Sequence, residues 1–204
     1  MLIKLIPFNY ILIFIGLFFQ LNSALGNSIQ SNDSLSSIGQ KLYLSLTDAL
    51  KEPLKVYKLC LGGQSLGTIP PDIELLKNLL ELNVTQNSLT TLPNGFSSLK
   101  NLIELNLSSN DLKVLPTGFE NLVLLEKLDI SGNPQLIHSR TVEVIARMKQ
   151  LQILNLGSND LTELPQNISK LTFLRELYLE GNTFSESEKN NIKSSLPSTK
   201  IFFD

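Results

Sequence analysis

The feature that most constrains this chain is a phrase that recurs at a fixed interval and ends in an aliphatic residue followed by proline. Within each copy, leucines and a polar residue keep the same spacing. A repeat of this period predicts a solenoid, because one unit is too small to bury a core and folds only as part of a stack. The four copies that carry the pair end at Ile69-Pro70, Leu92-Pro93, Leu115-Pro116 and Leu164-Pro165.

Each unit opens with a short alternation of apolar and polar residues, such as Leu105 and Leu107 set against Glu104 and Asn106. A period of two predicts a strand with one buried face. The units follow at steps of 23 residues, except for a step of 26 in the fourth, which therefore carries a three-residue insertion. Six units are predicted over residues 53–184, and they begin at Val56, Leu79, Leu102, Leu125, Leu151 and Leu174. In the fourth unit, apolar spacing predicts a helix from about Ser139 to Gln150.

A polar residue follows every strand, and five of the six are asparagines: Gln64, Asn87, Asn110, Asn133, Asn159 and Asn182. A buried asparagine at this point can hydrogen-bond the backbone groups that are left unpaired where the chain turns inward. Stacked units therefore predict a ladder of amides. The longer Gln64 fits an end rung, which has a neighbour on one side only.

These residues resemble the leucine-rich-repeat family in its 23-residue Leu-Pro form, and the chain is similar to the secreted bacterial members. Their arrays often start after a phrase like residues 46–51 followed by Pro53. The resemblance covers about residues 45–204. It implies an α/β horseshoe with a parallel sheet on the concave side, a helical N-terminal cap and a helix-strand C-terminal cap.

The segments before and after the repeats have patterns of their own. Residues 1–26 are typical of a secretory signal peptide, with Lys4, the apolar run 10–19 and a cleavage site predicted between Gly26 and Asn27. The alternative is an uncleaved membrane anchor, but the run is short of the roughly 20 residues that span a bilayer. Residues 27–37 are expected to be a flexible linker. Residues 38–52 have the apolar spacing of a cap helix that Pro53 ends, and residues 185–204 are expected to form the C-terminal cap.

The charge and cysteine content of the chain limit the kinds of partner that we expect. The chain has 17 basic and 19 acidic residues, and without residues 1–26 it keeps 16 and 19, a formal charge of −3. This balance argues against non-specific binding to nucleic acid or to an anionic membrane. Cys60 is the only cysteine, so no internal disulfide is possible, and a free thiol or an intermolecular disulfide remains.

No set of residues predicts catalysis. Cys60 and the only histidine, His138, stand three units apart, or about 14 Å at the spacing of strands. Glu81 and Glu104 lie on adjacent rungs, at the separation that a retaining glycosidase uses, but stacking alone produces this spacing. Both are expected to face open solvent beside Lys58 and Lys127. No cluster with metal-ligand spacing occurs, so no metal and no cofactor are predicted.

The outward positions of the strands form three columns, which we call the concave face; they start at Lys58, Cys60 and Gly62. Tyr178, flanked by acidic residues, is the expected anchor. A second candidate is the edge strip of Tyr57, Leu80 and Ile103. The candidate binding residues are Lys58, Glu81, Asn83, Thr85, Glu104, Asn106, Ser108, Lys127, Asp129, Ile153, Asn155, Glu176, Tyr178 and Glu180.

The sequence predicts a secreted, monomeric, non-enzymatic module that binds an extracellular or host protein through the concave face. With the signal peptide removed, no membrane-spanning segment is expected. The alternative hypothesis is a periplasmic or envelope structural protein that binds a cell-wall polymer or another envelope protein. Localisation separates the two.

Overall fold

The computed structural model describes residues 41–204. The predicted signal peptide, its cleavage site, the linker and the first residues of the predicted cap helix therefore lie outside the described residues. Within residues 41–204, no helix has the length and apolar character needed to span a bilayer.

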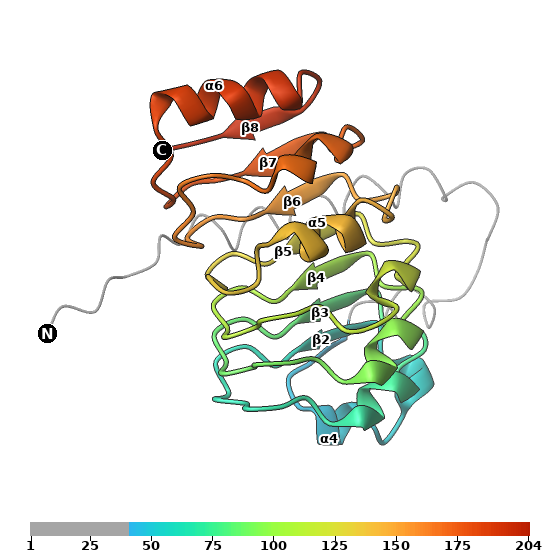
Figure 1. Cartoon of the computed structure of the whole chain (residues 1–204). Helices are drawn as coiled ribbons and strands as arrows, with labels where there is room; N and C mark the ends of the chain where they lie inside the picture. The colour runs from blue at the N-terminus through green and yellow to red at the C-terminus, as the bar shows by residue number, and fades with distance from the viewer. Residues whose placement is uncertain (1–40) are drawn as a thin grey trace, which may run out of the picture. The chain divides into compact units, whose positions relative to one another are not determined.

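The predicted parallel sheet is confirmed. Eight strands of the described part form one sheet in chain order, and every neighbouring pair is parallel. Figure 1 shows them stacked like rungs. The strands are β1 (Leu42–Tyr43), β2 (Lys58–Cys60), β3 (Glu81–Asn83), β4 (Glu104–Asn106), β5 (Lys127–Asp129), β6 (Ile153–Asn155), β7 (Glu176–Tyr178) and β8 (Lys200–Phe202).

Short helices return the chain from the end of one strand to the start of the next. Proline occupies the residue before or at the start of several of them, where its fixed φ suits a helix start and its missing N–H costs nothing. The 3-10 helices are η1 (Pro53–Lys55), η2 (Pro71–Leu75), η3 (Asn94–Ser98), η4 (Phe119–Asn121) and η5 (Gln166–Lys170). The α-helices are α4 (Leu46–Ala49), α5 (Ser139–Ile145) and α6 (Glu186–Ser195).

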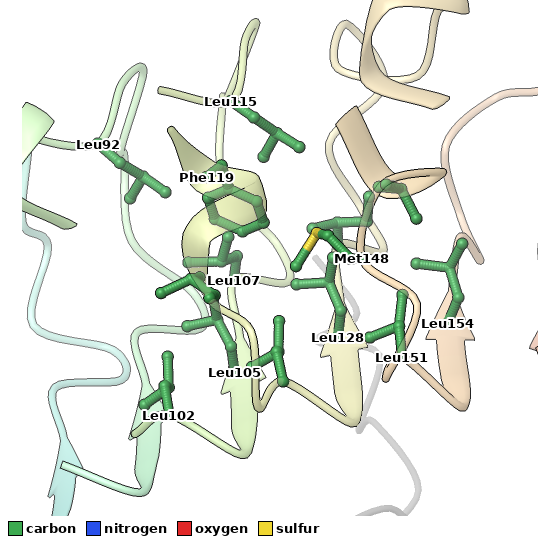
Figure 2. Packing of buried hydrophobic residues seen from close by; sticks show 14 of the residues in the cluster. Leu92, Leu102, Leu105, Leu107, Leu115, Phe119, Leu128, Met148, Leu151 and Leu154 are labelled. Atoms are coloured by element: carbon green, nitrogen blue, oxygen red, sulfur yellow. The ribbon is translucent and has the colours of Figure 1, made fainter. Parts of the chain in front are cut away.

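The core lies between the sheet and these return arms. The inward residues of β4 and its continuation, Leu105 and Leu107, are fully buried. Figure 2 shows them in one layer with Leu128 and Leu154, with Phe119 and Met148 coming from the return arms. Phe96 and Phe119, at the same position of consecutive units, stack with their ring centroids 6.3 Å apart. The repeat therefore buries one continuous core.

The predicted amide ladder is present. Asn110 lies inside the turn, where its Nδ2 donates to the carbonyls of Val84 and Leu107, and its Oδ1 accepts from the backbone N–H of Leu89. Asn87, Asn133 and Asn159 are also buried and bond in the same way. Gln64 is exposed, and its Nε2 reaches back to the carbonyl of Leu44 in the preceding turn.

The helix predicted over residues 38–52 is wrong in extent. Only α4 is α-helical within residues 41–52, and Leu42–Tyr43 instead form strand β1, which pairs with β2. Leucines at helical spacing suggested one helix, but the alternation of exposed Leu42, buried Tyr43 and exposed Leu44 also suits a strand. The edge of β2 decides between them, because its unpaired backbone groups gain a partner.

Two other helices differ less from expectation. Helix α5 begins at Ser139 as predicted but ends at Ile145 rather than at Gln150, because the chain then returns to the repeat through buried Met148. Helix α6 starts at the N-cap Ser185, whose Oγ accepts from the N–H of Glu188. The chain then ends in β8, which pairs with β7.

Candidate functional site

The register of the sheet assembles the concave face. Lys58, Glu81 and Glu104 are direct neighbours across β2, β3 and β4, and the second and third columns follow the same register. The flanking strands lengthen two columns. The first column runs Leu42, Lys58, Glu81, Glu104, Lys127, Ile153, Glu176 and Lys200. The second runs from Cys60 through Asn83, Asn106, Asp129, Asn155 and Tyr178 to Phe202.

The centre of the first column consists of two ion pairs. Lys58 Nζ lies 2.9 Å from Glu81 Oε1, and Lys127 Nζ is hydrogen-bonded to Glu104 Oε1. The expectation that both glutamates face open solvent is wrong, since their side chains are only 31% and 12% exposed. Burial raises the pKa of the Glu104 carboxyl, while the hydrogen bond and charge of Lys127 act to lower it. Each carboxylate is thus neutralised by its own lysine.

The polar residues of the second column hold the backbone of their own strand ends. Oδ1 of Asn83, Asn106 and Asn155 accepts from the N–H two residues ahead, each at 2.9 Å. Asp129 does the same with Ser131. In the third column, the hydroxyls of Thr85 and Ser108 are 2.7 Å apart. These predicted binding residues therefore also fix the shape of the face.

Asp129 is the acidic exception in the asparagine column. Its Oδ1 accepts from both the N–H and the hydroxyl of Ser131, and its Oδ2 accepts from Asn155 Nδ2 at 3.1 Å. Burial raises the pKa of the Asp129 carboxyl, although these hydrogen bonds lower it. Burial is the larger of the opposing effects.

The C-terminal end of the face is aromatic. The rings of Tyr178 and Phe202 stack with centroids 4.4 Å apart and planes inclined by 7°. The Tyr178 hydroxyl donates to Glu176 Oε2 at 2.6 Å, and Lys200 Nζ lies 4.6 Å from the centre of the Phe202 ring. Ile153, half-buried, precedes Glu176 in the first column. The predicted residues Ile153, Glu176 and Tyr178 thus lie on the same part of the face as Lys200 and Phe202. These two residues are not in the predicted set.

Comparison with known proteins identifies the repeat. Models of the leucine-rich repeat match residues 55–112, 93–134 and 150–171. The chain belongs to the leucine-rich-repeat family. A search of curated proteins found no match.

One solved structure similar to this leucine-rich-repeat protein is an internalin from Listeria monocytogenes strain 4b F2365. The TM-score is 0.55 and the identity 21%, and the match covers 75% of this chain. This chain matches 48% of the internalin chain, about half its length. Because the identity is this low, the likeness shows the fold alone. In all, 331 chains of solved structures match, so the fold by itself selects no partner.

The opposite end of the concave face in this leucine-rich-repeat protein is aliphatic. Leu42 is 52% exposed and pairs in register with Lys58, and Leu44, two residues further along, is 63% exposed. Neither leucine is among the predicted binding residues, because their spacing predicts a helix. The face therefore has apolar side chains at both ends and an ionic and amide-rich centre.

The other candidates of the sequence analysis are separated. Cys60 is half-buried in the second column, whereas His138 lies at the start of α5 with its Nε2 3.2 Å from the carbonyl oxygen of Lys113. Tyr57, Leu80 and Ile103 are each half-buried along the side where the strands begin. In the part of the chain that the structure describes, no group of three or more His, Cys, Asp or Glu residues could hold a metal ion.

Proposed function

We propose that this leucine-rich-repeat protein is a non-enzymatic protein-binding module, and that the C-terminal half of its concave face makes the contact. The observation that carries the proposal is the stacked pair Tyr178 and Phe202, placed on the solvent side of the sheet next to Ile153. Aromatic residues in a cluster are the commonest anchors of protein–protein contacts.

The rest of the face supports this role by being rigid. The amides and hydroxyls of the second and third columns already bond to neighbouring backbone or side chains, as at Asn106 and Ser108. Binding then orders few additional groups, so that less of the contact free energy is lost.

Charged residues beside the aromatic pair would orient a bound partner. Glu176 and Lys200 are neighbours in the first column, and Glu180 follows in the third. Stacking covers one face of each ring and does not cover the ring edges. Ring edges carry partial positive charge, so carbonyl oxygens and apolar side chains of a protein suit them.

The place of action is part of the same proposal. The pattern of residues 1–26 supports export and therefore a partner outside the cell. Fractionation of the source cells with an antibody separates release into the medium from retention in the envelope. Retention of all the protein in the envelope would favour the structural hypothesis.

The contact is tested with Tyr178→Ala and Phe202→Ala, and with the double charge variant Glu176→Lys, Glu180→Lys. Immobilised wild-type protein is used to capture partners, and the affinity of each captured protein is then measured with the variants. Because anchors typically contribute about 2 kcal/mol or more, each aromatic variant is expected to bind at least about tenfold more weakly.

Tyr57→Ala is the comparison variant, since Tyr57 is a half-buried tyrosine of the edge strip, outside the three columns, and a loss of affinity confined to it would assign the contact to that strip. It is expected to bind like the wild type, and circular dichroism checks that every variant is folded. Unchanged affinity in both aromatic variants would place the contact elsewhere and reject the proposal.

A further inference from the structure

A second surface lies where the chain enters the strands, on the side of each coil just before the sheet. We call this surface, defined by Lys77, Lys100, Val123, Leu124, Lys149 and Phe173, the entry edge. Its turns stack in register. Asn101 Nδ2 donates to the carbonyl of Lys77 in the preceding turn at 2.8 Å, and Lys77 Nζ lies 3.1 Å from Ser98 Oγ of the following one. Equivalent positions of successive turns therefore lie along one line.

The fourth turn of this edge lacks an amide hydrogen bond that the second and third turns have. Asn78 and Asn101 donate to a carbonyl of the preceding turn, but the equivalent residue is Leu124, which has no amide. Leu124 does not serve the core instead, since it is 48% exposed, and its neighbour Val123 is 55% exposed. The fold therefore gives no reason for two adjacent aliphatic residues at this turn.

Cations flank the doublet on both sides. Lys100 and Lys149 occupy the position of Val123 in the turns before and after it, and both are exposed. Lys149 Nζ lies 4.5 Å from the centre of the Phe173 ring. An acidic residue, Glu126, also lies on the entry edge, two residues after Leu124. By contrast, the side where the chain leaves the strands carries Asp111, Asp160 and Glu163, all exposed. The formal charge of the chain is only −2, but the entry edge is basic and the side where the chain leaves the strands is acidic.

We propose that the entry edge docks on an anionic phospholipid surface, with Val123 and Leu124 inserted among the headgroups and Lys100 and Lys149 beside the phosphates. Exposed aliphatic residues between lysines are the pattern of peripheral membrane contacts, since lysine keeps its charge in the headgroup layer while its stem covers apolar surface. A row of equivalent turns along one line also suits a planar target.

An acidic protein fits this edge less well. The doublet is far smaller than the roughly 800 Å² that each partner buries in a standard interface. Lysine, moreover, is depleted in such interfaces, whereas arginine and tyrosine are enriched. The proposal is independent of the concave face and goes beyond the function proposed above.

Vesicle co-sedimentation at low salt tests the proposal. The described residues 41–204 share one core, so a chain starting at Asn27 carries the whole edge without the apolar run of residues 10–19. It is expected to bind vesicles of equimolar phosphatidylcholine and phosphatidylglycerol and not vesicles of phosphatidylcholine alone. Lys100→Glu with Lys149→Glu, and Val123→Ser with Leu124→Ser, should each lower the partition coefficient about tenfold or more.

The chain offers a matched control on the opposite side. Lys113 and Val114 are an exposed lysine and an exposed valine there, and Lys113→Glu with Val114→Ser should bind vesicles like the wild type. Equal losses in the control and edge variants, or no preference for anionic vesicles, would overturn the proposal. Binding to soluble polyglutamate instead, lost in the lysine variant but not in the serine variant, would assign the edge to an acidic protein and also overturn it.

Discussion

At the scale of single residues, the turn after each strand contains a left-handed residue. Gln86, Ser109 and Ser158 have φ between 52° and 54° there, whereas the equivalent residue is glycine in three other units, as at Gly132 with φ 62°. A side chain in this region costs about 1–2 kcal/mol, which glycine avoids. At this position, half of the units therefore carry local backbone strain that the repeat imposes.

This strain predicts that Gln86→Gly stabilises the protein. The strain relieved should exceed the conformational entropy that glycine loses, giving a gain of roughly 0.5–1 kcal/mol in the free energy of unfolding. Urea denaturation measures it. Gln86→Ala, which removes the side chain but keeps Cβ, should show no gain, and an equal gain there would contradict the strain argument.

Asp129 gives a prediction about pH. Burial raises its pKa above the ordinary 3.8, so the folded state holds this proton more tightly than the unfolded chain does. Stability is therefore lost from this group as the pH rises from 3.8 through the higher folded pKa. We expect Asp129→Asn to be more stable than the wild type at neutral pH, and its urea midpoint to vary less across the weakly acidic range.

Asp111→Asn, at an exposed position, is the control for this comparison and should follow the wild type. A loss of stability in Asp129→Asn at neutral pH would mean that the hydrogen bonds from Ser131 and Asn155 outweigh the cost of burial.

At the scale of elements, the amide ladder joins each turn to the one before it. The Nδ2 of Asn110 donates to the carbonyls of Val84, Leu107 and Ser108. Its Oδ1 accepts from the N–H of Leu89. These groups lie away from water. Each of the three carbonyls also accepts a second hydrogen bond, from Asn87, Asn133 or the N–H of Gln86. The N–H of Leu89 has Asn110 Oδ1 as its acceptor.

Asn110→Leu should therefore destabilise the protein by roughly 1–3 kcal/mol, because the buried N–H of Leu89 loses its acceptor and each of the three carbonyls loses one of its two donors. Gln64→Leu is the matched control at the exposed end of the ladder, where the side chain bonds only to the carbonyl of Leu44, and it should cost less than about 1 kcal/mol. Similar losses in the two variants, measured by urea denaturation, would show that the buried ladder contributes little.

The elements also show how far the sequence could predict the structure. Strands β2–β7 follow from the alternation at Leu105 and Leu107 and its equivalents, because a period of two has one structural solution in so short a run. Residues 42–50 satisfy two periods at once, and only the unpaired edge of β2 selects the strand. Phe202 was missed as a site residue because β8 follows no repeat phrase, although alternation around Ile201 marks it.

At the scale of the whole described unit, the sequence predicts which residues share a column but not which of them form ion pairs. That Glu81 and Glu104 are neighbours follows from the repeat. That Lys58 and Lys127 each close on one of them depends on side-chain conformations, which a repeat does not specify. The separation of charge between the two sides was likewise hidden in a net charge near zero. Binding, if it uses both surfaces proposed above, involves two different kinds of target.

The in-register sheet also acts as a ruler. The aliphatic and aromatic ends of the concave face belong to β1 and to β7 and β8, and each intervening strand adds about 4.8 Å. Duplication or loss of one 23-residue coil during evolution would lengthen or shorten this separation by one fixed increment and leave the chemistry of both ends intact. Recombination among near-identical coils thus offers such a gene a way to change its targets in discrete steps of length.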